Sequence, residues 1–168
     1  MPEPAGVIAH NPNVAVTSLE LGGKVSEWDM ADESLKSFAH MAVAAQVGCS
    51  WCLDFGYFQA HNQNLDMAKA SQVPRWRQSE VFTPLERDVM EYAEAMTHTP
   101  PTVTDELSAR LLDQLGEAAM VELTVVIAFA NFSTKGNVVL GIESEGFSAA
   151  YEIPLAARPE NFPVASTA

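Results

Sequence analysis

Basic residues are scarce in this sequence: nine Lys and Arg stand against 22 Asp and Glu, which gives a formal net charge of −13 at pH 7. Proteins that bind nucleic acid or anionic membranes need clustered Lys and Arg side chains to meet the phosphate groups. The basic residues here are scattered along the chain instead. We therefore expect no nucleic-acid partner and no membrane partner.

Three sequence signals are also missing. The start, residues 1–13, is interrupted by proline and lacks the basic segment and apolar run of a signal peptide. No apolar stretch reaches the roughly 18 residues that a membrane-spanning helix needs. No array of His and Cys has the spacing of a zinc module. From these absences we expect a cytoplasmic protein that carries neither a metal nor a cofactor.

The composition is that of a globular domain. Apolar residues make up 48% of the 168 residues and charged residues 18%, so the chain can bury a core without disulfide or metal support. No internal repeat and no linker divides it. We predict one domain over residues 1–168, with a core over about 5–142 and an extended C-terminal tail over 143–168, in which prolines recur.

Helical patterns follow one another along the chain. Apolar side chains at residues 35, 38, 39, 42 and 43 have the spacing of one helical face, which predicts a helix as far as Gly48. Thr83-Pro84-Leu85-Glu86 combines an N-cap Thr, a Pro in the first turn and a capping-box Glu, so another helix should begin there. Weaker signals predict helices from residue 11 to Gly22-Gly23, over 66–72, and from 104 to Gly116.

The apolar stretch over residues 117–130 contains Val125-Val126-Ile127, which alone could form a strand. The stretch is longer than an ordinary strand and shorter than a membrane span, so a buried helix is the better interpretation. Because helix follows helix along the chain, we expect an all-α fold, a helical bundle.

The two cysteines of the chain, Cys49 and Cys52, form a CxxC pair. A secreted disulfide scaffold would spread its cysteines along the chain, so this pair indicates redox or metal chemistry in a reducing compartment. Gly48 lets the chain turn, which should place both cysteines in the first turn of a new helix. There the helix dipole lowers the pKa of a thiol, and the second thiol can resolve an oxidised first one into a disulfide. The alternatives are two buried, inert cysteines or half of a metal site.

Three separated segments match a known family in order. Residues 35–47 form an Ala-rich helix pattern that runs into Gly48-Cys49-Ser50-Trp51-Cys52-Leu53-Asp54. They are followed by Phe82-Thr83-Pro84-Leu85-Glu86-Arg87 and, in the long apolar stretch, by residues 121–128 with Asn131-Phe132. Over roughly residues 5–155 the chain resembles the carboxymuconolactone decarboxylase/alkylhydroperoxidase AhpD-like family.

The resemblance implies an AhpD-like helical bundle that forms homo-oligomers, from dimers to hexamers. In the redox branch of the family the CxxC reduces peroxides or relays electrons from a thiol or dithiol protein donor; the second cysteine attacks, so Cys52 would react and Cys49 would resolve. That branch also has a proton relay, a Glu twelve residues before the first cysteine and a His four residues after the second. These positions hold Ser37 and Gly56 here, so we do not carry the relay over and expect weak peroxidase activity.

Other side chains could replace the relay. His40 lies on the helix that leads into the pair and is the best substitute base, although a histidine simply packed between helices is the plainer interpretation. Glu122 lies within the apolar helix, where a carboxylate must be paired or protonated; it could help a thiol proton move or make a structural hydrogen bond. We expect Asp54 to cap a helix or face solvent, Trp51 to shield the pair, and His61 to lie at a surface or interface.

Three functions remain open. The first is a thiol-dependent oxidoreductase of the alkylhydroperoxidase or peroxiredoxin type, which acts on peroxide or a small molecule. The second is a redox-inactive oligomeric binding protein whose cysteines are only buried. The third is a cofactor-free decarboxylase of a small cyclic acid, for which Arg75 and Arg77 beside Trp76 could bind the carboxylate. We rank them in this order, and thiols inert to peroxide would favour the second.

Overall fold

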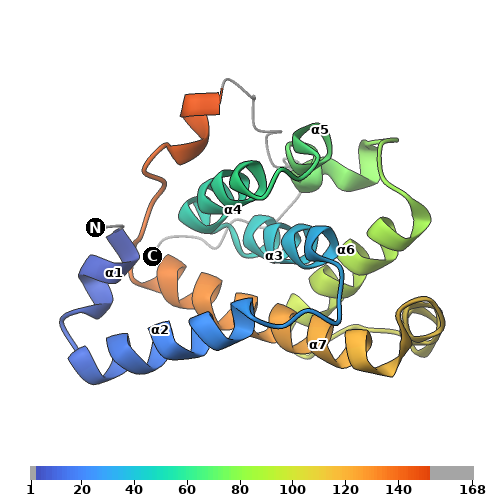
Figure 1. Cartoon of the computed structure of the whole chain (residues 1–168), viewed down its shortest axis with the longest axis horizontal. Helices are drawn as coiled ribbons and strands as arrows, with labels where there is room; N and C mark the ends of the chain where they lie inside the picture. Colours follow the sequence, from blue (N-terminus) through green and yellow to red (C-terminus); the bar gives the residue numbers. More distant parts are fainter. Residues whose placement is uncertain (1–2, 152–168) are drawn as a thin grey trace.

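The computed structural model describes residues 3–151, and every regular element within that range is a helix (Figure 1). The prediction of an all-α fold is confirmed. The elements are α1 (Glu3–Ile8), α2 (Pro12–Ser26), α3 (Glu33–Val47), α4 (Ser50–Asn62), α5 (Met67–Ala70), the 3-10 helix η1 (Val73–Gln78), α6 (Pro84–Thr97), α7 (Asp105–Val139) and the 3-10 helix η2 (Phe147–Tyr151). Helix α3 lies at the centre, where it packs against α4, α6 and α7.

Small and apolar side chains explain the central place of α3. Its buried residues include Phe38, Met41 and several alanines, so neighbouring helices can approach it closely from more than one side. Asp32 caps the start of the helix by accepting a hydrogen bond from the Ser34 N–H at 2.8 Å. Gly48 ends it with a left-handed φ of 84°, as the sequence predicts.

The helix starts predicted for α6 and α7 are confirmed. The Thr83 hydroxyl accepts a hydrogen bond from the Glu86 N–H at 3.2 Å, and the Glu86 carboxylate accepts one from the Thr83 N–H at 2.7 Å, which is a reciprocal capping box. Thr104 caps α7. Gly116, with φ 76° and ψ 168°, breaks the helical path of α7 where the sequence predicts a helix end, and the apolar part that follows is helical.

Helix α7 differs from the expectation that no apolar stretch of the chain is as long as a membrane span. It contains an 18-residue window with a mean hydropathy of 1.5, so by length and composition it could cross a membrane. The core helix of a globular protein passes the same test, because both are rich in apolar residues. One side of α7 packs against α3 and α6 and buries Leu123, Ile127 and Ala130; in all, 28% of the window is buried.

Two further boundaries differ from the expectation. Helix α2 continues through Gly22-Gly23 to Ser26, because a glycine inside a helix costs only about 1 kcal/mol and does not end it. The predicted extended tail is wrong for residues 147–151, which form η2 against α4; a buried carboxylate of α4 binds the start of η2, as described below. The rest of that predicted tail, residues 152–168, lies outside the described residues.

Candidate functional site

Cys49 and Cys52 lie where α4 begins, and a disulfide joins them with a Cα–Cα distance of 5.3 Å. Their predicted place at the helix start is confirmed. Cys49 is the N-cap residue, and its Sγ accepts a hydrogen bond from the Cys52 N–H at 3.2 Å. A sulfur in this position is stabilised as a thiolate by the free N–H groups and the dipole of the helix. Both cysteines are almost fully buried, with exposed fractions of 1% and 2%.

A pocket of about 380 Å³ lies beside the pair, between α2, α3, α4 and α7. Cys52 lines this pocket and Cys49 does not. Aromatic rings of Trp51, Phe55 and Phe129 form much of its apolar wall, and the Trp51 and Phe55 rings stack with centroids 4.8 Å apart. The pocket therefore gives a small, partly apolar molecule access to one sulfur of the pair.

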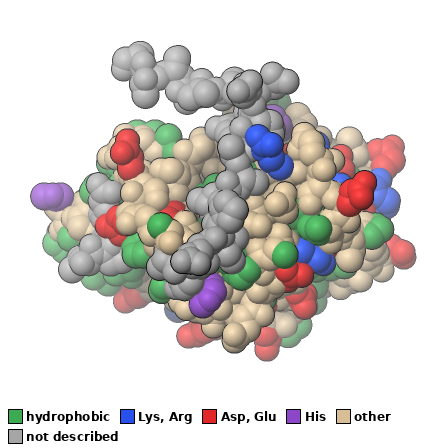
Figure 2. Space-filling model, turned by 90° about the horizontal axis from the view of Figure 1, so that it is seen from above, with side chains coloured by type: hydrophobic (Ala, Val, Ile, Leu, Met, Phe, Trp, Pro, Cys, Tyr) green, Lys and Arg blue, Asp and Glu red, His purple; other side chains and the backbone are tan. Residues whose placement is uncertain are grey.

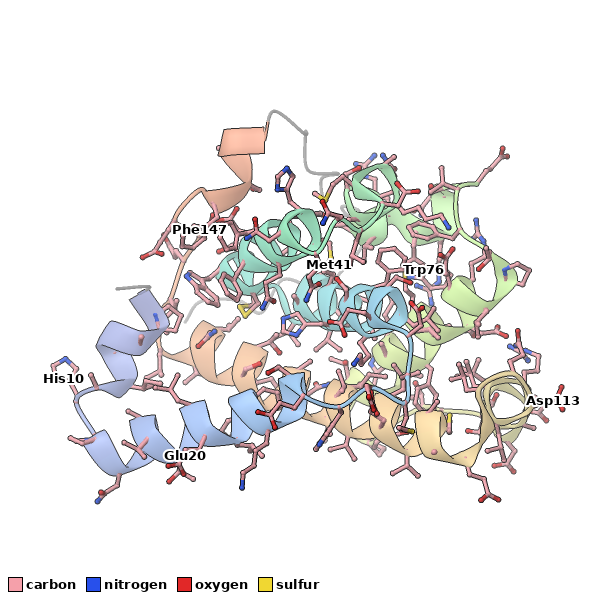
Figure 3. The ribbon with its side chains drawn as sticks, in the orientation of Figure 1. His10, Glu20, Met41, Trp76, Asp113 and Phe147 are labelled. Atoms are coloured by element: carbon pink, nitrogen blue, oxygen red, sulfur yellow. A yellow bond between two sulfur atoms is a disulfide. The ribbon has the colours of Figure 1, made fainter. Side chains whose placement is uncertain are left out.

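The two positions at which the resemblance places the proton relay both line the pocket, and they hold Ser37 and Gly56. A Cβ atom on Gly56 would lie 2.9 Å from Met41 Cγ, and Met41 is fully buried. Figure 3 shows Met41 between α3 and α4. The space that a histidine would need at this position is therefore filled by a core methionine.

His40 lines the same pocket, one helical turn beyond Ser37 on α3. Burial lowers the pKa of His40 to about 4, so the imidazole is neutral at pH 7. A neutral ring can accept a proton from a thiol, but the same lowered pKa makes it a weaker base, and it brings no positive charge to stabilise a thiolate. The structure thus brings His40 and Cys52 to one cavity, and a catalytic role for His40 stays a prediction.

Glu122 is not among the residues that line the pocket. Its carboxylate accepts hydrogen bonds from the Met30 N–H at 2.8 Å and the Ala31 N–H at 3.2 Å, and it lies 3.2 Å from Lys36 Nζ. Desolvation raises the pKa of Glu122, but these bonds outweigh it and leave the pKa below its usual value. The contacts join α7 to the segment between α2 and α3; a role for Glu122 in thiol proton transfer stays a prediction.

Lys36 lines the pocket, but acceptors surround its ammonium group. Its Nζ donates to the Trp28 carbonyl at 2.5 Å and lies 3.0 Å from the carboxylate of Glu33 and 3.2 Å from that of Glu122. An ammonium has three donors, so these partners use all of them. Among the described residues that line the pocket, no cation is left free to bind a carboxylate.

The arginines considered for a carboxylate clamp lie elsewhere. Arg75 and Arg77 belong to η1 and do not line the pocket. Arg77 stacks on the Trp76 ring at 4.1 Å and forms an ion pair with Glu94. On the part of the face in Figure 2 that grey atoms leave visible, the basic groups lie apart from one another.

Sequence reasoning missed Asn137. Its Nδ2 donates a hydrogen bond to Cys52 Sγ at 3.3 Å, and the residue lines the pocket from α7. An amide donor at this distance stabilises negative charge on the sulfur. The one signal in the sequence is a polar residue beside Val138-Val139 near the end of the apolar helix, which is too weak to identify a partner 85 residues away.

The expectation that Asp54 could face solvent is wrong, because it is 1% exposed. Its carboxylate accepts hydrogen bonds from the Ser144 hydroxyl at 2.8 Å and from the Phe147 and Ser148 N–H groups at 2.8 and 2.7 Å. It therefore caps η2 from a different helix. Desolvation raises the pKa of Asp54, but the bonds from Ser148 and its neighbours outweigh it and lower the pKa below its usual value.

These bonds hold residues 144–148 against the first turns of α4. The Ser144 N–H donates to the Ser50 hydroxyl at 3.2 Å. The Phe147 ring packs against the rings of Trp51, Phe55 and Phe58, with centroids 5.7 to 6.3 Å apart (Figure 3). The segment thus supports two residues of the pocket wall from behind.

The remaining histidines carry no sign of chemistry. His61 is exposed near the end of α4, and His10 and His98 are exposed near other helix ends. Within residues 3–151 no cluster of three or more His, Cys, Asp or Glu side chains is arranged to hold a metal ion. The cysteine pair and its pocket remain the candidate site.

No family model matches the sequence. The chain is 34% identical over 115 residues to the uncharacterized protein YnjA of Escherichia coli (strain K12); the match covers 68% of this chain and spans only 63% of the length of that protein. Among solved structures, the debrominase Bmp8 has a TM-score of 0.80 at 21% identity, over 89% of this chain and 81% of that one.

A cysteine-to-alanine variant of Bmp8 in complex with 2,3,4-tribromopyrrole matches equally well, with a TM-score of 0.80 at 20% identity, over 92% of this chain and 83% of that one. A protein of unknown function from Agrobacterium tumefaciens, proposed to be the antioxidant defence protein AhpD, has a TM-score of 0.72 at 17% identity, over 82% of this chain and 94% of that one. The chain has an AhpD-like fold. At these identities the likeness shows the fold alone, so family membership and oligomeric assembly stay predictions.

Proposed function

We propose that this protein is a thiol-dependent oxidoreductase that reduces small hydroperoxides through the Cys49–Cys52 couple. One observation carries the proposal: the two sulfurs are close enough to be joined, yet of the two only Cys52 lines the pocket between α2, α3, α4 and α7. An arrangement that exposes one sulfur to a small molecule and keeps its partner covered separates an attacking thiol from a resolving one.

The reaction has two steps in this site. The Cys52 thiolate attacks the terminal oxygen of the hydroperoxide, the O–O bond breaks, and the alkoxide takes up a proton to leave as an alcohol. The Cys52 sulfenic acid then reacts with the Cys49 thiol, so that the disulfide forms and water leaves. The Asn137 amide stabilises the Cys52 thiolate, and the N-cap position stabilises the Cys49 thiolate.

The pocket wall favours an apolar hydroperoxide. Trp51, Phe55 and Phe129 offer apolar surface, so an aromatic or alkyl substituent gains contact area that hydrogen peroxide lacks. Without a Glu and a His at the relay positions, proton transfer relies on the neutral His40 or on water. We therefore expect slow turnover, with higher rates for cumene hydroperoxide than for hydrogen peroxide.

Single-cysteine variants test the assignment of the two sulfurs. Reduced Cys49→Ser should react with cumene hydroperoxide and yield a Cys52 sulfenic acid that dimedone traps, which intact mass will detect. Reduced Cys52→Ser should stay unmodified under the same conditions, because Cys49 does not line the pocket. Trapping on Cys49 alone would reverse the assignment, and no trapping in either variant would argue for the redox-inactive binding protein.

A second candidate is reductive dehalogenation of a small aromatic halide. The aromatic lining beside Cys52 and the fold shared with Bmp8 favour it. Two thiols and one carbon–bromine bond would give a disulfide, a carbon–hydrogen bond, bromide and a proton, so the electrons balance. Bromide release from tribromopyrrole by reduced protein in the absence of oxygen tests it, and Cys52→Ser serves as the control.

The third candidate, a cofactor-free decarboxylase, lacks support in the described pocket. Its anionic substrate would need a free cation, and the ammonium of Lys36 is already surrounded by acceptors. Conversion of a cyclic carboxylic acid by Cys52→Ser protein would nevertheless establish it, because that activity needs no thiol.

We also propose a cytoplasmic homo-oligomer. A couple that must be reduced again after each turnover suits a reducing compartment. Val121, Val125 and Phe132 lie along one side of α7 and are 64%, 43% and 59% exposed, which leaves an apolar strip for a second copy to cover. Light scattering after size-exclusion chromatography will give the mass in solution; a monomer at micromolar concentration would contradict the assembly.

A further inference from the structure

The proposed function requires a reductant for the disulfide, and the geometry restricts what that reductant can be. Thiol–disulfide exchange proceeds by attack of a donor thiolate on one sulfur while the other leaves. The donor must therefore reach a sulfur atom directly. The question is which sulfur it can reach, and from which side.

Cys49 offers no route. It is 1% exposed and packs in a small cluster with Ala44, Cys52 and the partly buried Trp51 and Val138. Cys52 is equally buried but lines the pocket. A donor that enters the pocket can therefore attack Cys52, whereas a donor at the outer surface meets neither sulfur.

The thiolate that would leave after attack on Cys52 is that of Cys49, and the structure stabilises it. Attack on Cys52 releases Cys49 as the thiolate, and Cys49 Sγ already accepts the Cys52 N–H at the start of α4. An N–H group that stabilises the leaving thiolate favours its departure. Attack on the sulfur that the pocket exposes thus expels a thiolate that a helix N–H group stabilises.

The size and charge of the pocket define the donor. A cavity of about 380 Å³ holds a small molecule, but the thiol of a folded protein is carried on a surface too broad to enter it. The ammonium of Lys36 has its acceptors in place, and the whole chain has a net charge of −13. Anionic thiols therefore meet repulsion without a compensating cation.

We propose that the pocket is the single port for both half-reactions, and that the reductant is a neutral thiol of low molecular weight. The inference rests on the proposed function and names its second substrate. A first donor thiolate attacks Cys52, which forms a mixed disulfide and releases the Cys49 thiolate. A second donor thiol then attacks the donor sulfur of the mixed disulfide, so that Cys52 leaves reduced and the donor is oxidised to its disulfide.

The test starts from the disulfide made with diamide, so its outcome does not depend on any reaction with peroxide. Reduction of the intact chain is followed by alkylation and intact mass, with dithiothreitol, 2-mercaptoethanol, anionic 2-mercaptoethanesulfonate and reduced thioredoxin as donors. Two variants narrow the pocket: Ser133→Phe on α7 and Gln59→Trp on the exposed side of α4. Asn62→Trp is the matched control, because it is exposed on α4 and does not line the pocket.

We expect both narrowing variants to lose about tenfold or more in the rate of reduction by dithiothreitol, and the control to stay within about twofold of the original chain. At equal thiolate concentration, 2-mercaptoethanesulfonate should be slower than 2-mercaptoethanol. Unchanged rates in both narrowing variants would overturn the proposal. Faster reduction by thioredoxin than by dithiothreitol at equal thiol concentration would also overturn it, in favour of a protein donor. Gln59→Trp alters only an exposed side chain, so it keeps the test valid if Ser133→Phe fails to fold.

Discussion

Substitution of Gly56 by alanine tests why this site has no relay histidine. In a helix interior alanine is favoured over glycine by about 0.5–1 kcal/mol. At Gly56, however, the new Cβ would lie 2.9 Å from Cγ of the fully buried Met41. Overpacking of this kind costs about 1–3 kcal/mol. Gly136 on α7 provides the control, because it is exposed and nothing lies within 4 Å of a Cβ there.

We expect Gly136→Ala to raise the free energy of unfolding slightly. The free energy of unfolding of Gly56→Ala should lie about 1–3 kcal/mol below that of the Gly136→Ala control. Urea unfolding followed by far-UV circular dichroism will measure both. If Met41 is the cause, the two sites will be coupled, and the cost of Gly56→Ala will shrink in a Met41→Ala background. Equal stabilisation by the two alanines would refute the reasoning, because it would show that Met41 leaves room for a larger side chain at the relay position.

We make three further predictions for the ionisable side chains Asp54, Glu122 and His40. Asp54→Asn should lower the free energy of unfolding by about 1–3 kcal/mol at pH 7. Because the pKa of Asp54 is lowered in the fold, this loss of stability should shrink as the pH falls below about 4, the pKa of an Asp side chain in the unfolded chain. A loss that does not change with pH in urea unfolding would contradict this prediction. Glu122→Gln should lower the free energy of unfolding by about 3 kcal/mol without slowing thiol oxidation in the folded protein. Slower oxidation would instead support proton transfer by Glu122. The rate of oxidation should show no histidine inflection near pH 6.5, because the pKa of His40 is about 4; an inflection that His40→Asn removes would show that the ring titrates normally.

The sequence predicts most of the fold because its helix signals are local. The capping box of α6, the N-cap of α7 and the left-handed Gly48 depend on a few neighbouring residues. The helix end predicted at Gly22-Gly23 is wrong, since glycine lowers helix propensity without ending a helix whose neighbours remain favourable. The 3-10 helix η2 could not be predicted, because its N–H groups bond to a carboxylate more than 90 residues away.

In the candidate site, too, some features are predicted from local sequence patterns and others depend on contacts between distant parts of the chain. The CxxC spacing singles out Cys49 and Cys52 as candidates, and His40, the substitute base considered from the sequence, lies at the same pocket as Cys52. The contribution of Asn137 and the wall supplied by Phe129 depend on how α7 passes α4, which no local pattern encodes. The burial of Asp54 was missed for the same reason, since a charged residue is usually exposed unless distant partners satisfy it.

Whether Cys49 and Cys52 form a working couple is measured on the reduced protein mixed with a slight excess of cumene hydroperoxide. Free thiols are counted against time, and the intact mass is recorded before and after. We expect the loss of two thiols with a mass decrease of about 2 Da, which corresponds to one intramolecular disulfide. No loss of thiols, with both cysteines alkylated only after unfolding, would contradict it and show that the pair is structural.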